Sequence, residues 1–161
     1  IIMLKPGDKV LYPLHGAGII DDIIKKENDG TEKSFFVVSL INSTMKISIP
    51  VENAKENGVR PIVSENEVNY LLDNFNDIEL ESDTNWNKRC RDNIDLLKDG
   101  DIEKSAAVYK DLMQRNSIKS LSAGERKIML NARQMLSTEF MLVLNISKDD
   151  AETLLNDALK K

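Results

Sequence analysis

The sequence predicts an α+β protein, with a small antiparallel β-barrel at its N-terminus followed by an all-α helical bundle. Three observations lead to this fold class. Residues 1–60 contain short runs of β-branched and aromatic residues between turn signals, which is typical of strands. From about residue 64 the apolar residues follow a helical period. The chain has 161 residues, 41% of them hydrophobic and 30% charged, a balance that suits one or two small globular domains.

Four apolar runs in the first part predict strands. They are Val10-Leu11-Tyr12, Ala17 to Ile24, Phe35 to Ile41 and Met45 to Ile49. The residues Asn28-Asp29-Gly30 tolerate positive φ, so we expect the second and third runs to form a hairpin. Apolar and polar residues alternate in the fourth run, which predicts one buried and one solvated face. We therefore expect a strongly bent sheet whose outer strands offer unpaired N–H and C=O groups to another chain.

Five helices are predicted in the second part. They begin near Ser64, Thr84, Ile102, Ser122 and Ser147, and those that begin at Thr84 and Ile102 end near Lys98 and Asn116. Ser64 with Glu67, and Ser122 with Glu125, have the spacing of capping boxes. Gly100 suits the left-handed position that follows a helix. Helices this short need tertiary packing, so we expect them to form one bundle.

Charge is distributed unevenly along the chain. Residues 76–85 are acidic and rich in turn formers, which indicates a linker. The formal net charge is −5, yet residues 86–133 hold 11 basic and 7 acidic side chains. Such a basic stretch is more often a solvated helical face than a binding surface. On charge alone, both interpretations remain open.

Several classes of protein are excluded or disfavoured. No apolar run approaches the ~20 residues of a membrane-spanning helix, and the N-terminus lacks the features of a secretory signal. We therefore expect a cytoplasmic protein with no membrane partner. Cys90 and His15 are the only cysteine and histidine, so neither a disulfide within the chain nor the usual zinc site is possible.

Catalysis is also disfavoured. His15 lies in a glycine-containing segment, but that segment lacks the spacing of a phosphate-binding loop. Basic neighbours could lower the pKa of Cys90, but a dyad with His15 would need an orienting residue and an oxyanion hole. We expect no enzyme activity, no cofactor, no bound metal and no small-molecule substrate.

Trp86 is the only tryptophan, and the sequence gives it two interpretations. Its spacing to Cys90, Ile94 and Leu97 predicts a place at the end of an apolar helical stripe, within the core. Its basic neighbours favour an exposed position instead. They are Lys88, Arg89 and Arg91. Proteins that bind the DNA minor groove combine an apolar wedge with such cations.

Four motifs resemble the CarD/CdnL family of bacterial transcription regulators. They are Val10-Leu11-Tyr12-Pro13-Leu14-His15-Gly16, Ile49-Pro50-Val51-Glu52-Asn53-Ala54, Asn85-Trp86-Asn87-Lys88-Arg89 and Leu121-Ser122-Ala123-Gly124-Glu125-Arg126. The motifs follow in order over nearly the whole chain. The resemblance implies a Tudor-like domain over 1–63 that binds the RNA polymerase β subunit. It further implies a connecting helix and acidic linker over 64–83, and a helical DNA-binding domain over 84–161.

The resemblance also implies which residues make contacts. Trp86 is similar to the family's minor-groove tryptophan, which stabilises the promoter open complex at the upstream edge of the bubble without reading its sequence. The residues expected to contact DNA with it are Lys88, Arg89, Arg91, Arg115, Arg126 and Lys127. Those expected to contact polymerase are Lys26, Lys46, Ile47, Ser48 and Ile49. Some relatives have arginine where this chain has Ser48. Through polymerase, the protein is expected at the nucleoid.

A second function remains open at this point. The acidic total charge and the ordinary helical charge pattern fit a protein-only adaptor, in which the helical bundle docks a second protein. Trp86 would then lie in that protein interface. A DNA-binding assay on forked templates with polymerase present separates this adaptor from the transcription regulator.

Overall fold

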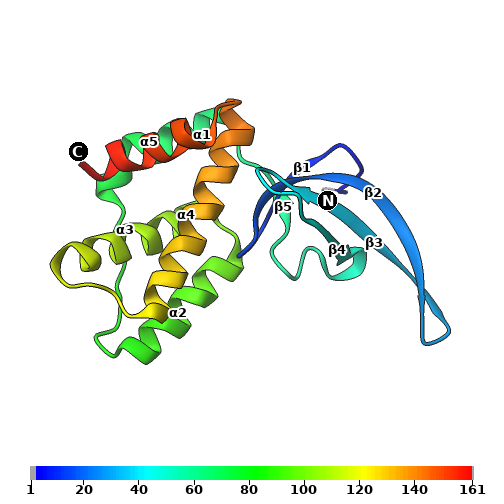
Figure 1. Cartoon of the computed structure of the whole chain (residues 1–161), viewed down its shortest axis with the longest axis horizontal. Coiled ribbons are helices and arrows are strands. Elements are labelled where there is room, and N and C mark those ends of the chain that lie inside the picture. Colours follow the sequence, from blue (N-terminus) through cyan, green and yellow to red (C-terminus); the bar gives the residue numbers. More distant parts are fainter. Residues whose placement is uncertain (1–2, 161) are drawn as a thin grey trace.

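The computed structural model describes residues 3–160 and has two modules side by side, a sheet and a helical bundle (Figure 1). This arrangement confirms the predicted α+β class. Residues 1 and 2 of the predicted first domain, and Lys161 of the last, lie outside the described residues. The strands are β1 (Lys9–Tyr12), β2 (Gly16–Asn28), β3 (Thr31–Leu40), β4 (Lys46–Pro50) and β5 (Arg60–Pro61).

The sheet is antiparallel and open, with strand order β4-β3-β2-β1-β5. The predicted small β-barrel is therefore not confirmed, because the described sheet does not close. Closure would require pairing between β4 and β5, but β5 has only two residues, and both pair with β1. A 3-10 turn over Val51–Asn53 leads the chain away from β4. One face of the sheet still buries an apolar core of its own, formed by Val10, Ile20, Phe36, Val38, Leu40, Ile49, Ala54 and Val59.

The hairpin of β2 and β3 is the longest feature of the sheet, and it projects away from the bundle (Figure 1). Its two-residue turn has positive φ at both Asp29 (52°) and Gly30 (77°), as the sequence predicted. Pairing continues through polar residues up to Asn28 and Thr31, beyond the apolar runs that marked the strands. The register shifts between Ile20 and Asp22, which marks a β-bulge.

Five helices form the bundle. They are α1 (Glu65–Asp73), α2 (Trp86–Asp99), α3 (Ile102–Ile118), α4 (Ala123–Leu144) and α5 (Lys148–Lys160), and a short 3-10 helix η2 (Phe75–Asp77) follows α1. The capping box of Ser64 and Glu67 is confirmed, with both reciprocal hydrogen bonds present. Gly100 has the expected left-handed conformation after α2. The connecting helix α1 packs on α4 and α5, so it contributes to the bundle core.

The two modules share a buried interface. Arg60 of β5 donates to both carboxylate oxygens of Glu139 on α4, at 2.6 and 2.8 Å, and the Val63 N–H donates to the same carboxylate at 2.9 Å. The Glu139 side chain is only 1% exposed. A Cβ on Gly58 would lie 2.6 Å from the Lys98 carbonyl oxygen, so the backbones approach closely there. These contacts hold the sheet in a fixed orientation on the bundle.

Candidate functional site

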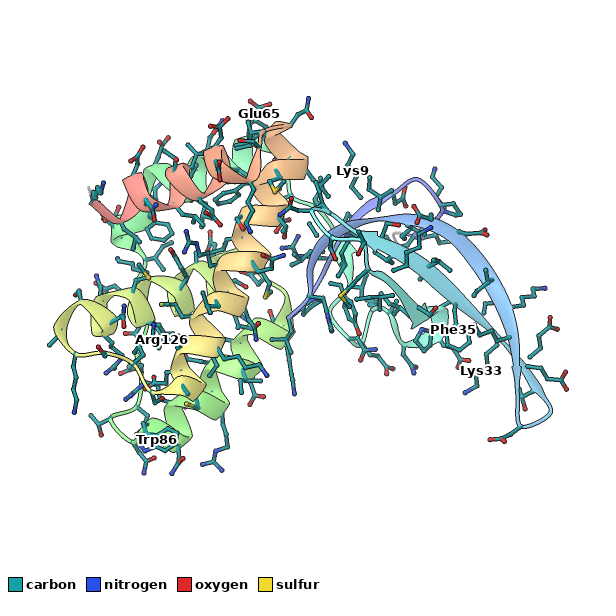
Figure 2. All side chains as sticks on the ribbon, in the orientation of Figure 1. Lys9, Lys33, Phe35, Glu65, Trp86 and Arg126 are labelled. Carbon is teal, nitrogen blue, oxygen red and sulfur yellow. The ribbon has the colours of Figure 1, made fainter. Side chains whose placement is uncertain are left out.

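Trp86 lies at the first turn of α2, at the end of the bundle far from α1 and α5 (Figure 2). The Asn85 side chain caps the helix by accepting the N–H groups of Asn87 and Lys88, at 3.0 and 3.2 Å. The Asn85 N–H donates to Asp83 at 2.8 Å, which lowers the pKa of that carboxyl. The Trp86 side chain is 52% exposed. The core position predicted from helical spacing is therefore wrong, and the indole lies at the surface.

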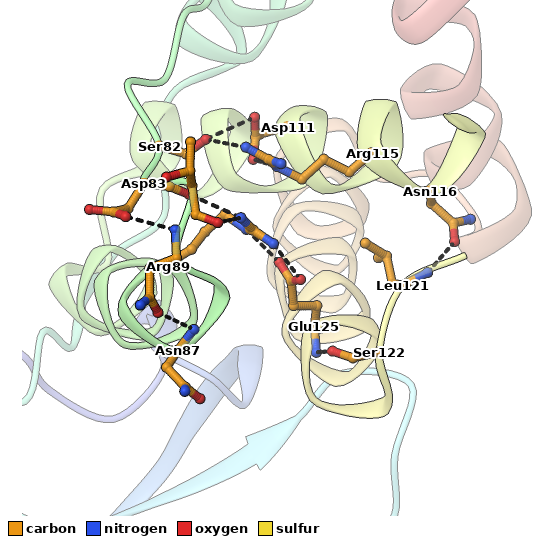
Figure 3. A network of polar contacts seen from close by, with 12 residues as sticks. Ser82, Asp83, Asn87, Arg89, Asp111, Arg115, Asn116, Leu121, Ser122 and Glu125 are labelled. Carbon is orange, nitrogen blue, oxygen red and sulfur yellow. Dashed lines mark hydrogen bonds and ion pairs between the residues drawn. The ribbon is translucent and has the colours of Figure 1, made fainter. Parts of the chain in front are cut away.

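A buried ion pair joins Arg89 to Glu125 (Figure 3), and both residues line the same hollow as Trp86. Arg89 Nε and Nη2 donate to the two carboxylate oxygens of Glu125 on α4, both at 2.8 Å, and Nη1 donates to the Asp83 carbonyl at 3.0 Å. Arg89 is 8% exposed and Glu125 is 4% exposed. Bidentate pairs of this kind fix geometry as well as charge. The ion pair joins the start of α2 to the start of α4.

This ion pair changes two expectations from the sequence. The Arg89 guanidinium is enclosed by protein acceptors, so we assign it to positioning α2 in place of the predicted phosphate contact. The second capping box is only half formed, since Ser122 accepts the Glu125 N–H at 3.2 Å while the Glu125 carboxylate turns to Arg89. The bidentate bond to Arg89 joins two ionised groups, whereas the return bond of a capping box would join the carboxylate to an uncharged N–H.

The other predicted DNA-contacting cations differ in their surroundings. Arg115 is half-buried, and donates to Asp111 at 2.9 Å and to Ser82 at 2.7 Å. It therefore holds the linker against α3. Lys88 is exposed and pairs with Asp92 at 3.0 Å and with Asp83 at 3.4 Å, which raises its pKa.

Three of the predicted DNA-contacting cations remain at the surface of this end of the bundle. Arg91, Arg126 and Lys127 are exposed, and none of them has an ion pair within residues 3–160. Arg126 and Lys127 lie in the first turns of α4, whose N-terminus carries partial positive charge. We call Trp86 and these three cations the Trp86 surface.

Sequence reasoning missed part of this region. Trp86 borders a hollow of about 530 Å³, and Ile118 and Lys119 at the end of α3 line its opposite side. The Ile118 side chain is 88% exposed. The sequence contained one signal for this exposure: Ile118 is an apolar residue outside the buried stripe of α3, and Lys119 follows it directly.

The predicted polymerase-contacting residues belong to β4 and the hairpin. β4 is an edge strand, paired with β3 on one side only within the described sheet. The Lys46 and Ser48 side chains are exposed, and Ile47 is half-buried. Ile49 is 1% exposed and belongs to the core, so its side chain is unavailable to a partner. Lys26 is exposed on β2, with its ammonium 5.4 Å from the Phe35 ring centroid.

Comparison with known proteins agrees with this two-module arrangement. The family model of the CarD-like/TRCF RID domain matches residues 4–63, and that of the CarD C-terminal domain matches residues 70–156. The chain belongs to the CarD family. It is also 31% identical over 146 residues to the protein named "Putative transcription factor YdeB" of Bacillus subtilis (strain 168), and the match covers 91% of this chain and 95% of that relative.

The CarD family is a family of transcription regulators. Burial raises the pKa of the Cys90 thiol, which opposes the activation that its basic neighbours suggested. His15 stacks on Tyr12 in the sheet module, with ring centroids 4.5 Å apart. Residues 3–160 contain no group of three potential metal ligands, and no helix in that range is long and apolar enough to cross a membrane.

In this CarD-family protein, Glu125→Gln is expected to make the free energy of unfolding depend less steeply on pH in the acid range. Hydrogen bonds from Arg89 lower the pKa of Glu125 below its usual value of 4.5. Such a carboxyl stabilises the fold above its unfolded pKa, and this contribution is lost as the pH falls through the folded value. In urea unfolding, the wild type should lose stability more steeply than Glu125→Gln between about pH 5 and pH 3. Parallel profiles would contradict this role of Glu125.

Proposed function

We propose that this protein regulates transcription by binding the RNA polymerase β subunit through its sheet module and stabilising the promoter open complex through its bundle. The observation that carries this proposal is the Trp86 surface, which has an exposed indole and unpaired cations at one end of the bundle. At this end, the Arg89–Glu125 ion pair joins α2 to α4. Membership of the CarD family, and the match of residues 4–63 to the CarD-like/TRCF RID domain, support a role in transcription through RNA polymerase. We place the protein in the cytoplasm, at the nucleoid.

On the DNA side, we propose that Trp86 acts as a wedge at the upstream edge of the bubble. Arg91, Arg126, Lys127 and Lys88 then contact phosphates of the neighbouring minor groove, without reading bases. Unstacking a base step costs a few kcal/mol, so a wedge that fits the opened junction binds the open state better than the closed one. A difference of ~1.4 kcal/mol raises the ratio of open to closed complexes about tenfold.

On the polymerase side, we propose that β4 adds to a strand of the β subunit. The Leu40 N–H donates to the Met45 carbonyl, and the register pairs Val38 with Ile47 and Phe36 with Ile49. Hydrogen-bonded pairs alternate in antiparallel ladders, so Lys46 and Ser48 direct their backbone groups to the outer edge. The backbone groups of Ile49 point toward β3 instead. We propose that Lys26, on β2, contacts the β subunit beside β4.

The two contacts depend on each other. The protein has a net charge of −5, and the Trp86 surface contains only Arg91, Arg126 and Lys127 as cations without an ion pair among the described residues, so affinity for DNA alone should be weak and fall steeply with salt. Binding to polymerase supplies a high effective concentration of the Trp86 surface near the junction. The interface between the modules keeps the distance from β4 to Trp86 constant.

Ser48→Pro is expected to weaken binding to the isolated β subunit by about tenfold or more, because it removes an outward N–H that strand addition uses. The β3 ladder stays intact, since proline is tolerated on the free side of an edge strand. Binding is measured by biolayer interferometry with immobilised β subunit.

Ser48→Ala is the matched control for this substitution. It removes the hydroxyl but keeps the backbone N–H, so its affinity should equal that of the wild type. Equal affinity of Ser48→Pro and Ser48→Ala would show that the polymerase contact does not use this edge, and the interface would have to lie elsewhere.

A further inference from the structure

A second surface lies at the other end of α2, around Tyr70 on α1. Two adjoining hollows of about 650 and 490 Å³ share Tyr70, Leu71 and Glu103 in their linings. The Tyr70 side chain is 64% exposed between them. Apolar side chains from α1, the linker, α2 and α3 contribute to the linings, namely Leu71, Ile78, Leu96 and Ile102. We call these two hollows the Tyr70 groove.

The rim of the Tyr70 groove is strongly acidic. Six carboxylates line the two hollows: Glu67, Asp77, Glu79, Asp99, Asp101 and Glu103. Among residues 3–160, only two cations line them, and both are engaged within the protein. Arg60 is bound to Glu139, and Lys104 pairs with Asp99 at 3.1 Å. The groove therefore combines exposed apolar surface with a surplus of negative charge.

One wall of the groove is held in place by α3. Lys110 Nζ donates to the carbonyl oxygens of Asn76 and Ile78, both at 2.7 Å. Farther along the linker, Ser82 accepts a hydrogen bond from Arg115. A wall that is already ordered lowers the conformational cost of binding a partner.

We propose that the Tyr70 groove docks a basic peptide segment of a partner protein, with apolar side chains of the segment packing against the exposed Tyr70 and the half-buried Ile78 and Ile102. Charge complementarity selects this occupant, because lysines or arginines of the segment would face the acidic rim. The same charge repels nucleic acid and the anionic lipids of a membrane surface. α2 separates the groove from Trp86 by roughly 15–20 Å along its axis. The groove therefore remains accessible when the Trp86 surface is covered by DNA.

The test uses a fluorescein-labelled amphipathic peptide made of leucine and lysine, titrated with the full chain and followed by fluorescence anisotropy. Saturable binding is expected, and a matched peptide of leucine and glutamate should not bind. Asp77→Lys/Glu79→Lys reverses two exposed charges of the rim and should weaken binding about tenfold or more. Tyr70→Ala should weaken binding with the charges unchanged.

A second double substitution controls for net charge. Glu27→Lys/Glu32→Lys changes the net charge by the same amount on the β2–β3 hairpin, where the two residues face each other across the strands. This variant should bind the peptide at least half as tightly as the wild type. Equal losses in the two double variants would overturn the proposal, since they would indicate unspecific attraction. Sedimentation equilibrium that shows dimers lost in Tyr70→Ala would also overturn it, by making a second copy the occupant.

Discussion

Glu139→Ala is expected to lower the free energy of unfolding by about 3–5 kcal/mol, the usual cost of removing one partner of a buried ion pair. The substitution leaves the Arg60 guanidinium without its carboxylate and the Val63 N–H without its acceptor, at a site where Glu139 is almost fully enclosed. The loss falls at the interface of the two modules. Equilibrium unfolding in urea measures it.

Glu152→Ala provides the matched control for Glu139→Ala, since it also removes a glutamate that pairs with an arginine. Glu152 and Arg133 are 3.2 Å apart, and both side chains are partly exposed. Pairs in such surroundings contribute about 0.2–1 kcal/mol. If Glu139→Ala cost no more than Glu152→Ala, the Arg60–Glu139 pair would not be what holds the modules together.

Local signals predicted much of the fold. The positive-φ residues of the β2–β3 turn, the capping box at Ser64 and the glycine after α2 each act within a few residues, so the sequence alone identified them. The open sheet was not predictable in this way. Closure depends on whether β4 meets β5, and the apolar pattern of a strand does not reveal its neighbours.

The candidate site was predicted in part for the same reason. Sequence pattern identified Trp86 and the cations around it, but not which of these cations are used within the protein. Arg89 and Glu125 lie 36 positions apart, and only the packing of α2 against α4 brings them together. The exposure of the Ile118 side chain was not predictable from the sequence, because it depends on where α3 ends relative to the neighbouring helices.

Trp86→Ala is expected to abolish the effect on open complexes while leaving polymerase binding unchanged. The indole is half-exposed and lies in the bundle, whereas β4 lies in the sheet module, so its removal changes neither the sheet nor its edge (Figures 1 and 2). The cations of the Trp86 surface remain and still attract DNA, but they favour closed and open duplex alike. A ligand with equal affinity for two states shifts no population. Trp86→Phe retains a smaller apolar ring and should keep part of the effect.

The lifetime of the open complex shows whether Trp86 acts as a wedge. We would measure it on a ribosomal-type promoter with the cognate polymerase, with the wild type, Trp86→Phe or Trp86→Ala, or with no added protein, after a heparin challenge. We expect the wild type to lengthen the lifetime about tenfold, Trp86→Phe to lengthen it less and Trp86→Ala not to lengthen it at all. Equal lengthening by the wild type and Trp86→Ala would contradict the wedge, and a protein-only adaptor would then be the better description.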